Sequence, residues 1–358
     1  MFLAIKEMRY SKLRYGLIIG IMLLIAYVVF MLSGLARGLA EEFKKAIDDW
    51  DAQEIILSED ANKTFAASQL TRNDIFRIDN SETAPIGLYS GAIDDEENKI
   101  NISVFGTNED AFILPKVTEG TSFRRMNDII ISQNLAEKGY KIGDEVKIGN
   151  SDEVLTIVGI FPETFYTVTP VIYTSLDTWS ILKFGDQPFT SEEEQPINII
   201  AVKTNQGTIN NDGKTKLEKL SKDDFIESIP GYSAQNLTLD AMVYFLFFVV
   251  AAVVGIFMYV ITLQKTNIFG VMKAQGISNT FIAKSIVGQS LMVGLIGVAA
   301  AFVLAYLTSF ILPEAMPFAI MFDQWFIYSG ILILVAVLGG LFSVHTVTKV
   351  DPITAIGG

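Results

Sequence analysis

Two long apolar segments separated by a short basic one limit the possible folds of this chain more than any other feature. They run from Met242 to Leu263 and from Ile286 to Leu312. A stretch of about 20 apolar residues, rising roughly 1.5 Å each as a helix, crosses a hydrocarbon core of roughly 30 Å. The polar piece between the segments carries three lysines and no acidic residue. Because cytoplasmic loops are rich in basic residues, we predict a helical hairpin whose tip lies in the cytoplasm.

Two further apolar runs, Gly16 to Ala36 and Phe326 to Val344, bring the number of candidate transmembrane helices to four. Eight of the 27 basic residues lie outside the segment 37–240. These are Lys6, Arg9, Lys12, Arg14, Lys265, Lys273, Lys284 and Lys349. Four crossings with both termini inside place all eight in the cytoplasm, so this orientation is predicted. A cleaved signal peptide is the alternative for the first run, which is longer than a signal core of about 7–15 residues.

The segment 37–240 is large enough to be a domain of its own. It holds all but four of the 40 acidic residues, which argues against a nucleic-acid partner and for a solvated surface. The chain has no cysteine, so a hydrophobic core rather than disulfides must hold this domain together. Runs of β-branched or alternating residues between turn-forming residues predict strands, and two segments predict helices. The strands are expected at 54–58, 101–107, 128–132, 145–149, 154–161, 171–175 and 197–204, and the helices at 133–138 and 213–229.

The predicted fold class is an α-helical membrane protein with four transmembrane helices and a mixed α/β extracellular domain inserted between helices 1 and 2. Gly16 and Gly20 have a spacing that allows two helices to approach closely. The predicted order is an N-terminal cytoplasmic interfacial helix (1–14), transmembrane helix 1 (15–36), the extracellular domain with a helical stalk (37–240), transmembrane helix 2 (241–263), a cytoplasmic hairpin tip (264–285), transmembrane helix 3 (286–312), a short extracellular loop (313–325), transmembrane helix 4 (326–345) and a cytoplasmic tail (346–358).

Three segments resemble the MacB and FtsX type of ABC-transporter permease. Residues 128–161 resemble the family's order of a strand, a short helix, Gly-Asp and a strand ending in Val-Gly-Ile. The matching residues are Gly143, Asp144, Val158, Gly159 and Ile160 in this segment, Gly270, Val271, Lys273, Ala274, Gly276 and Ser278 in the hairpin tip, and Asp351, Pro352 and Ala355 in the tail. Asn267, Gln275 and the absence of a final Leu-Arg depart from the family pattern. The opening of the chain looks most like the haem-exporting permeases called HrtB.

This resemblance implies the permease subunit of an ABC exporter in the plasma membrane of a bacterium, acting as a homodimer with two copies of a cytoplasmic ATPase. The hairpin tip would dock on that ATPase. The alternative is that the tip is merely a polar turn. The expected coupling residues are Ile268, Phe269, Gly270, Val271, Met272, Lys273, Ala274, Gly276 and Ser278. Haem is the cargo that the resemblance favours, and antimicrobial peptides or other amphiphiles are the alternative. An FtsX-like transducer, which controls an extracellular cell-wall hydrolase without transport, is an alternative function.

Catalysis by this chain is not expected. The segment from Gly207 to Thr215 has one residue more between its glycines than a phosphate-binding loop, so ATP and Mg²⁺ are expected on the partner ATPase. The single histidine, His345, is placed at the cytoplasmic end of the fourth helix, where we expect a structural role. Without cysteine or an outward histidine, the outer domain has no Ser-His, Cys-His or His-rich metal constellation. We therefore predict no catalytic residue, no metal site and no intrinsic cofactor.

Aromatic, thioether and carboxylate side chains near the outer ends of the first two spans form the candidate substrate site. A thioether, a phenol or a carboxylate can ligate haem iron, and aromatic rings stack on a porphyrin. The candidates are Phe30, Met31, Phe43, Tyr232, Asp240, Tyr244 and Phe248. The alternative is that these residues face lipid or pack between helices, because aromatic residues are enriched at both membrane interfaces.

Overall fold

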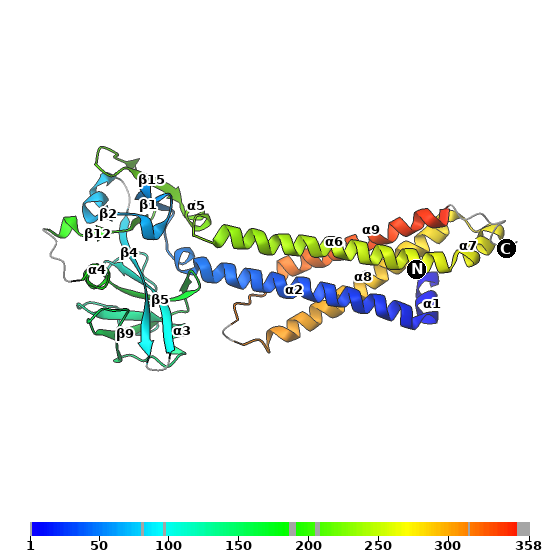
Figure 1. Ribbon diagram of the computed structural model, residues 1–358, viewed down its shortest axis with the longest axis horizontal. Coiled ribbons are helices and arrows are strands. Elements are labelled where there is room, and N and C mark those ends of the chain that lie inside the picture. The colour runs from blue at the N-terminus through cyan, green and yellow to red at the C-terminus, as the bar shows by residue number, and fades with distance from the viewer. Residues whose placement is uncertain are drawn as a thin grey trace. The chain divides into compact units, whose positions relative to one another are not determined.

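The structure is a computed structural model that describes residues 2–79, 82–95, 98–185, 191–204, 208–313 and 316–348. It divides into two compact units (Figure 1). The helical unit comprises residues 1–38 and 236–358, and the α/β unit comprises residues 39–235. The side chain of His345 and the tail after residue 348, both subjects of the sequence analysis, lie outside the described residues.

Among the residues that the structure describes, four helices are long and apolar enough to cross a membrane. With two short helices they are α1 (Phe2–Tyr10), α2 (Lys12–Asp48), α6 (Tyr232–Gln264), α7 (Thr266–Ala274), α8 (Asn279–Ser309) and α9 (Phe322–Thr348) (Figure 1). The helices extend beyond the apolar runs, since α2 continues to Asp48 and α6 begins at Tyr232. α8 begins at Asn279, earlier than the apolar run at Ile286. The predicted fold class is confirmed, with four long apolar helices and an α/β domain between the first and the second.

Glycine allows α6 and α9 to pack with their backbones in contact. A Cβ atom added to Gly339 of α9 would lie 2.7 Å from the carbonyl oxygen of Ala251 and 3.0 Å from the nitrogen of Gly255, both on α6. Inside a bilayer there is little hydrophobic driving force between helices, so close packing of small residues is a main source of association. A Cβ atom on Gly16 or Gly20 would meet nothing within 4 Å, so the close approach that their spacing allows is not made within the described chain.

Polar side chains connect four helical segments at the end of the bundle that carries α1. The Tyr15 hydroxyl donates to Gln289 Oε1 over 2.5 Å, and Gln289 Nε2 donates to the Glu7 carboxylate. Lys265 Nζ, between α6 and α7, lies 3.1 Å from an oxygen of the same carboxylate. Polar groups withdrawn from water cost free energy unless they are paired, so this network favours one arrangement of α1, α2, α8 and the α6–α7 junction.

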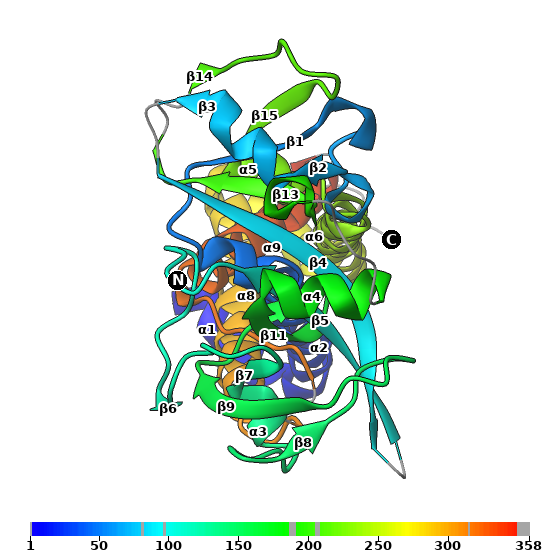
Figure 2. The ribbon, with the colours of Figure 1, turned by 90° about the vertical axis from the view of Figure 1, so that its left-hand side faces the viewer.

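The α/β unit is built on a mixed sheet of 11 strands (Figure 2). Its order is β15-β1-β13-β4-β5-β11-β7-β9-β6, with β10 paired to β11 and β8 to β9. The β5–β11 and β7–β9 pairs are parallel, and the other pairs are antiparallel. The bounds are β1 (Glu54–Ser58), β4 (Thr83–Asp95), β5 (Asn98–Thr107), β6 (Glu119–Gly120), β7 (Asp128–Ser132), β8 (Glu145–Val146), β9 (Leu155–Phe161), β10 (Phe165–Tyr166), β11 (Thr169–Ser175), β13 (Ile199–Val202) and β15 (Leu217–Ser221).

Smaller elements complete the α/β unit. β2 (Leu70–Thr71) pairs with β12 (Pro196–Ile197), and β3 (Ile78–Asp79) pairs with β14 (Thr208–Ile209). The α-helices confined to this unit are α3 (Gln133–Ala136), α4 (Leu176–Phe184) and α5 (Lys222–Glu227), and the four 3₁₀ segments described are 59–61, 65–67, 72–77 (η3) and 192–194.

α4 packs on the sheet where two neighbouring strands carry glycine. Gly87 of β4 and Gly106 of β5 lie opposite each other, and a Cβ atom on either would lie 2.3 Å from side-chain atoms of Trp179. Trp179 is fully buried on this glycine pair. The Ser175 side chain accepts the Thr178 N–H over 3.2 Å and caps the start of α4. Neither α4 nor β4 was predicted from the sequence.

The prediction of one helix over 213–229 is wrong. The structure has β15 followed by α5. Leu217 and Leu220 have a spacing that suits one face of a helix, but as strand residues they point into two separate hydrophobic clusters. β15 pairs with β1, with Leu220 opposite Ile55. The Ser221 side chain then accepts the Asp224 N–H over 3.1 Å, which starts the helix only at this point. The predicted strands at 54–58 and 128–132 are confirmed.

The close contact at Gly339 can be tested by comparing two glycines of α9. Replacing Gly339 by Ala should destabilise the protein, because overpacking against the α6 backbone costs about 1–3 kcal/mol. Gly330→Ala is the matched control, since a Cβ atom there meets nothing within 4 Å. It should leave stability unchanged or raise it by up to about 1 kcal/mol, because Ala favours a helix over Gly. Thermal unfolding in detergent measures both, and equal effects of the two variants would contradict the packing described.

Candidate functional site

An apolar groove lies between α2 and α6 of the helical unit. It has a volume of about 640 Å³ and is lined by Leu32, Leu237, Thr238, Ala241, Met242, Phe245 and Leu246. The α6 residues recur at spacings of three and four, so they share one face of that helix. Leu237 is 72% exposed and Phe245 is 64% exposed, which means that the groove opens outward. Its chemistry suits the apolar part of an amphipathic molecule.

Three of the seven predicted substrate residues form a stripe beside this groove. Asp240, Tyr244 and Phe248 are four residues apart on α6 and are all exposed. A spacing of four brings side chains to the same face of a helix, so a carboxylate, a phenol and a phenyl ring follow one another along it. We call these three residues the α6 stripe. None of the three is among the residues that line the groove, so they lie on a neighbouring face of α6 rather than in the groove itself.

Two other predicted residues point into the helical bundle. Phe30 is fully buried, with its ring centroid 5.6 Å from that of Phe302 and 5.2 Å from that of Trp325. Met31 is half-buried and packs against the same core. Phe30 therefore belongs to the core of the helical unit and does not line the groove. None of the residues that line the groove was predicted from the sequence, although their spacing along α6 places them on one face of that helix.

Phe43 and Tyr232, the last two predicted residues, belong to the α/β unit. Their ring centroids are 6.1 Å apart, Tyr232 is buried and Phe43 is half-buried against the core of that unit. They connect the final turns of α2 to the first turn of α6. These two rings therefore hold the end of α2 and the start of α6 together.

In the predicted coupling segment, one residue ends α7 and another caps the start of α8. Gly276 has φ +85°, and it ends α7 by donating its N–H to Lys273 O over 2.9 Å, while Ile277 N–H donates to Met272 O over 3.0 Å. This pair of bonds is a Schellman motif, which needs the left-handed conformation that glycine adopts readily. The Ser278 side chain then accepts the Phe281 N–H over 3.3 Å and caps α8.

The remaining predicted coupling residues divide into a buried and an exposed set. Phe269 and Gly270 are buried, and Met272 packs half-buried against the helical core. Ile268 is 57% exposed and Val271 is 43% exposed, and Ala274 is exposed as well. Large aliphatic side chains on an exposed polar turn are a surface that another protein can cover.

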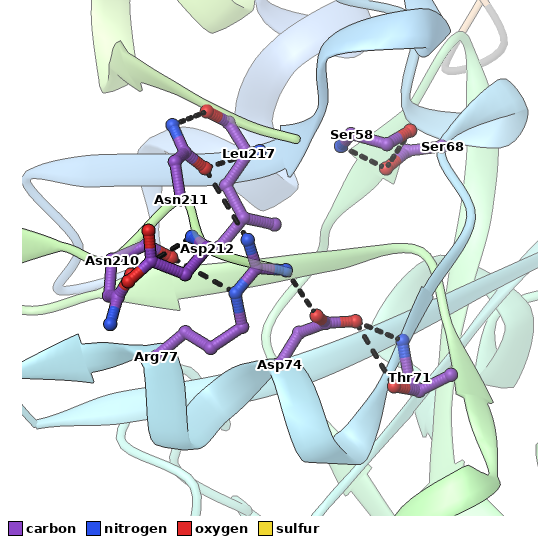
Figure 3. A network of polar contacts seen from close by, with 9 residues as sticks. All are labelled: Ser58, Ser68, Thr71, Asp74, Arg77, Asn210, Asn211, Asp212 and Leu217. Atoms are coloured by element: carbon purple, nitrogen blue, oxygen red, sulfur yellow. Dashed lines mark hydrogen bonds and ion pairs between the residues drawn. The ribbon is translucent and has the colours of Figure 1, made fainter. Parts of the chain in front are cut away.

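The segment that resembled a phosphate-binding loop is an exposed turn around an arginine (Figure 3). Gly207 lies outside the described residues. Arg77 Nε donates to Asn210 O over 3.0 Å, and Nη1 donates to Asp74 Oδ1 over 2.7 Å. The Asn211 amide oxygen accepts the Leu217 N–H over 2.9 Å. These polar groups hold the turn to the η3 segment and β15, which is a structural function.

A cavity of about 480 Å³ in the α/β unit contains a lysine with an altered pKa. Lys183 Nζ donates to Leu88 O and to Asn198 Oδ1, each over 3.1 Å, and lies 4.9 Å from the ring centroid of Trp179. Burial lowers the pKa of Lys183 to about 8. Its two acceptors connect α4 to β4 and to the segment between β12 and β13, so this lysine acts as a structural link. Among the described residues no group of three or more His, Cys, Asp or Glu could hold a metal ion.

Both units match known domain families. Residues 15–220 match the MacB-like periplasmic core domain, which is more than half of the chain, and residues 241–352 match the FtsX-like permease C-terminal domain. The chain belongs to the MacB/FtsX-like permease family. The resemblance noted in the sequence is confirmed, and the α/β unit of this permease is of the kind that lies outside the cytoplasm.

Relatives of the permease extend over its full length. One from Staphylococcus epidermidis is 30% identical over 369 residues, and one from Staphylococcus haemolyticus is 28% identical over 367 residues. The names of both describe a hemin transport system permease protein, HrtB. An ABC transporter permease from Mycobacterium bovis is 22% identical over 364 residues. Each alignment covers 100% of this chain and 99% of the relative. The permease is an ABC transporter subunit without an ATPase domain, and a partner ATPase is implied.

The pKa of Lys183 makes the stability of the permease depend on pH. Between about pH 8 and the ordinary lysine value of 10.5, the unfolded chain binds more protons at this site than the folded chain. The free energy of unfolding therefore rises with pH over this window. In the Lys183→Met variant, the free energy of unfolding should rise less steeply with pH over this window. Lys138→Met, at an exposed lysine of the same unit, should keep the slope of the wild type. Thermal unfolding in detergent from pH 8 to 10.5 measures the slopes, and equal slopes for Lys183→Met and wild type would refute this pKa.

Proposed function

We propose that this permease exports haem, taking it from the outer leaflet of the plasma membrane of a bacterium. The observation that carries the proposal is the apolar groove between α2 and α6, because a pocket between the first two spans suits uptake from the bilayer. The names of the staphylococcal relatives support haem as the cargo. In this orientation both termini and α7 lie in the cytoplasm, which agrees with the eight basic residues outside the segment 37–240.

The groove and the α6 stripe together match the chemistry of haem. The porphyrin face is apolar and aromatic, so it would lie along Met242 and Phe245 in the groove. Iron accepts a phenolate ligand, and Tyr244 is 62% exposed beside the groove. Met31 is the thioether alternative, but its half-buried side chain must turn outward first. Asp240 is a second oxygen ligand or a hydrogen-bond acceptor for a protonated propionate.

ATP-driven motion would enter through the exposed side chains of α7. Ile268 and Val271 would fill a recess on the partner ATPase, while Phe269 anchors α7 to the bundle. We propose that two permease chains and two ATPase chains form the working complex. The face of α2 with Gly16 and Gly20 supports pairing, since a Cβ atom at either position would meet nothing within 4 Å in the described chain.

Two alternatives keep the same architecture. Another amphiphile, such as an antimicrobial peptide, could use the apolar groove without needing an iron ligand. An FtsX-like transducer would instead act on an extracellular cell-wall hydrolase through the α/β unit. The groove favours export over transduction, because a transducer has no need of an outward apolar recess between its first two spans.

Haem binding tests the cargo. Haem added to the purified permease in detergent should give a shifted Soret band, and Tyr244→Phe should weaken binding about tenfold by removing the phenolate while keeping the ring. Tyr259→Phe is the control, since Tyr259 is exposed on the same helix but about 22 Å further along its axis. Met31→Ala should weaken binding only if the thioether is the ligand. An unshifted Soret band with the wild type would remove haem as the cargo and leave the permease assignment intact.

Substitutions in α7 test the coupling surface. Ile268→Asp and Val271→Asp should each weaken co-purification of the partner ATPase about tenfold or more, as loss of an anchor residue does at protein interfaces. ATP hydrolysis by the complex should fall in parallel. Ile142→Asp, at a 44% exposed position of the α/β unit, is the control and should change neither. Unchanged ATPase binding in both α7 variants would place the docking surface elsewhere.

A further inference from the structure

A second cavity lies at the opposite end of the helical unit from the groove. It has a volume of about 720 Å³, is open to the surface, and is lined by α1, the start of α2 and the α6–α7 junction. Four basic side chains line it, which are Lys6, Arg9, Arg14 and Lys265. Among the described residues that line it, Glu7 is the only acidic one. We call it the basic cavity. The proposed export function assigns it no role.

The one carboxylate of the basic cavity is occupied by other groups. Glu7 lies 3.1 Å from Lys265 Nζ and accepts a hydrogen bond from the Gln289 amide. Arg14 Nη1 donates to Gln264 Oε1 over 2.5 Å, and a neutral amide leaves the charge of the guanidinium uncompensated. Arg9 is exposed. The cavity thus keeps an excess of positive charge, with two arginines able to bind an anion through several N–H donors each.

Apolar side chains surround these charges and remain exposed. Tyr10 is 94% exposed, Leu13 is 91% exposed and Ile268 is 57% exposed. α1 itself carries Ile5 and Met8 next to Lys6 and Arg9, the pattern of a helix that lies in a membrane interface. Basic side chains bordering exposed apolar ones suit a ligand with an anionic head and an apolar body. A free phosphate ion would leave most of the cavity unfilled and the apolar rim uncovered.

We propose that the basic cavity binds the phosphate-bearing headgroup of an anionic phospholipid from the inner leaflet. Arg9 and Arg14 would bind the phosphate, and Tyr10 and Leu13 would contact the glycerol and the first part of the acyl chains. Basic pockets between helices at the cytoplasmic side of a membrane favour such headgroups. The bound lipid would bridge α1 to the α6–α7 junction, which also carries the exposed coupling residue Ile268.

Native mass spectrometry of the purified full-length permease, without its ATPase, tests this proposal. With equimolar phosphatidylglycerol and phosphatidylcholine, we expect phosphatidylglycerol to bind about tenfold tighter, because only it carries a net negative charge. Arg9→Gln and Arg14→Gln should each reduce that preference about fivefold. Arg124→Gln, at an exposed arginine of the α/β unit, is the matched control and should retain it. Inorganic phosphate at the same concentration should not displace the lipid.

Three outcomes would overturn the proposal. Equal binding of the two lipids by the wild type would show that the cavity does not select an anionic headgroup, which is also the result expected if the ATPase is the natural occupant. A preference retained in both arginine variants would place the lipid elsewhere. Displacement by equimolar inorganic phosphate would identify a soluble phosphate group as the ligand. The wild-type comparison decides the first outcome even if a variant fails to fold.

Discussion

The absence of water inside a bilayer is the constraint on which the rest of this permease depends. Backbone N–H and C=O groups in hydrocarbon must bond within their own segment, so each apolar run becomes a helix. Packing between helices must then come from shape and from internal polar pairs rather than from the hydrophobic effect. The structure uses both, with Gly339 against the α6 backbone and the hydroxyls of Thr262 and Ser343 bonded to each other inside the bundle. Charged groups are left to the helix ends, where the basic cavity lies.

The α/β unit is attached to the end of α2 through its backbone. Thr167 and Val168 form the turn between β10 and β11, and their N–H groups donate to Phe43 O and Glu42 O, each over 3.0 Å. Both have positive φ, 48° and 65°, a conformation that β-branched residues rarely adopt and that costs roughly 1–3 kcal/mol per residue. The two bonds to α2 offset part of this cost. Because β11 is an interior strand of the sheet, these bonds connect the end of α2 to the middle of the α/β unit.

The parts of the fold that were predictable from sequence are those set by local physics. Four apolar runs of membrane length give the four spanning helices without reference to packing. Tertiary contacts decided the rest. Leu217 and Leu220 fit a helix until the edge of β1 is available for pairing, and β4 contains Gly87, which reads as a turn residue until Trp179 packs on it. Phe30 was expected at the substrate, but its ring is buried against Trp325 in the helical core, a contact that cannot be read from the sequence.

In the coupling segment too, local structure explains some of the family-pattern residues without any contact to a partner. Gly276 and Ser278 match the family pattern, yet the Schellman turn and the cap of α8 account for both without any partner. A match at these positions therefore supports a sharp turn between two helices, and a sharp turn is compatible with docking or with a plain hairpin. Docking rests instead on Ile268 and Val271, whose exposure serves no purpose in the turn itself. An aliphatic surface kept in water at a helix end is disfavoured unless another protein or the lipid interface covers it. Phe269 is buried two residues before Val271, and residues two apart on a helix do not share a face, so Val271 is directed away from the core.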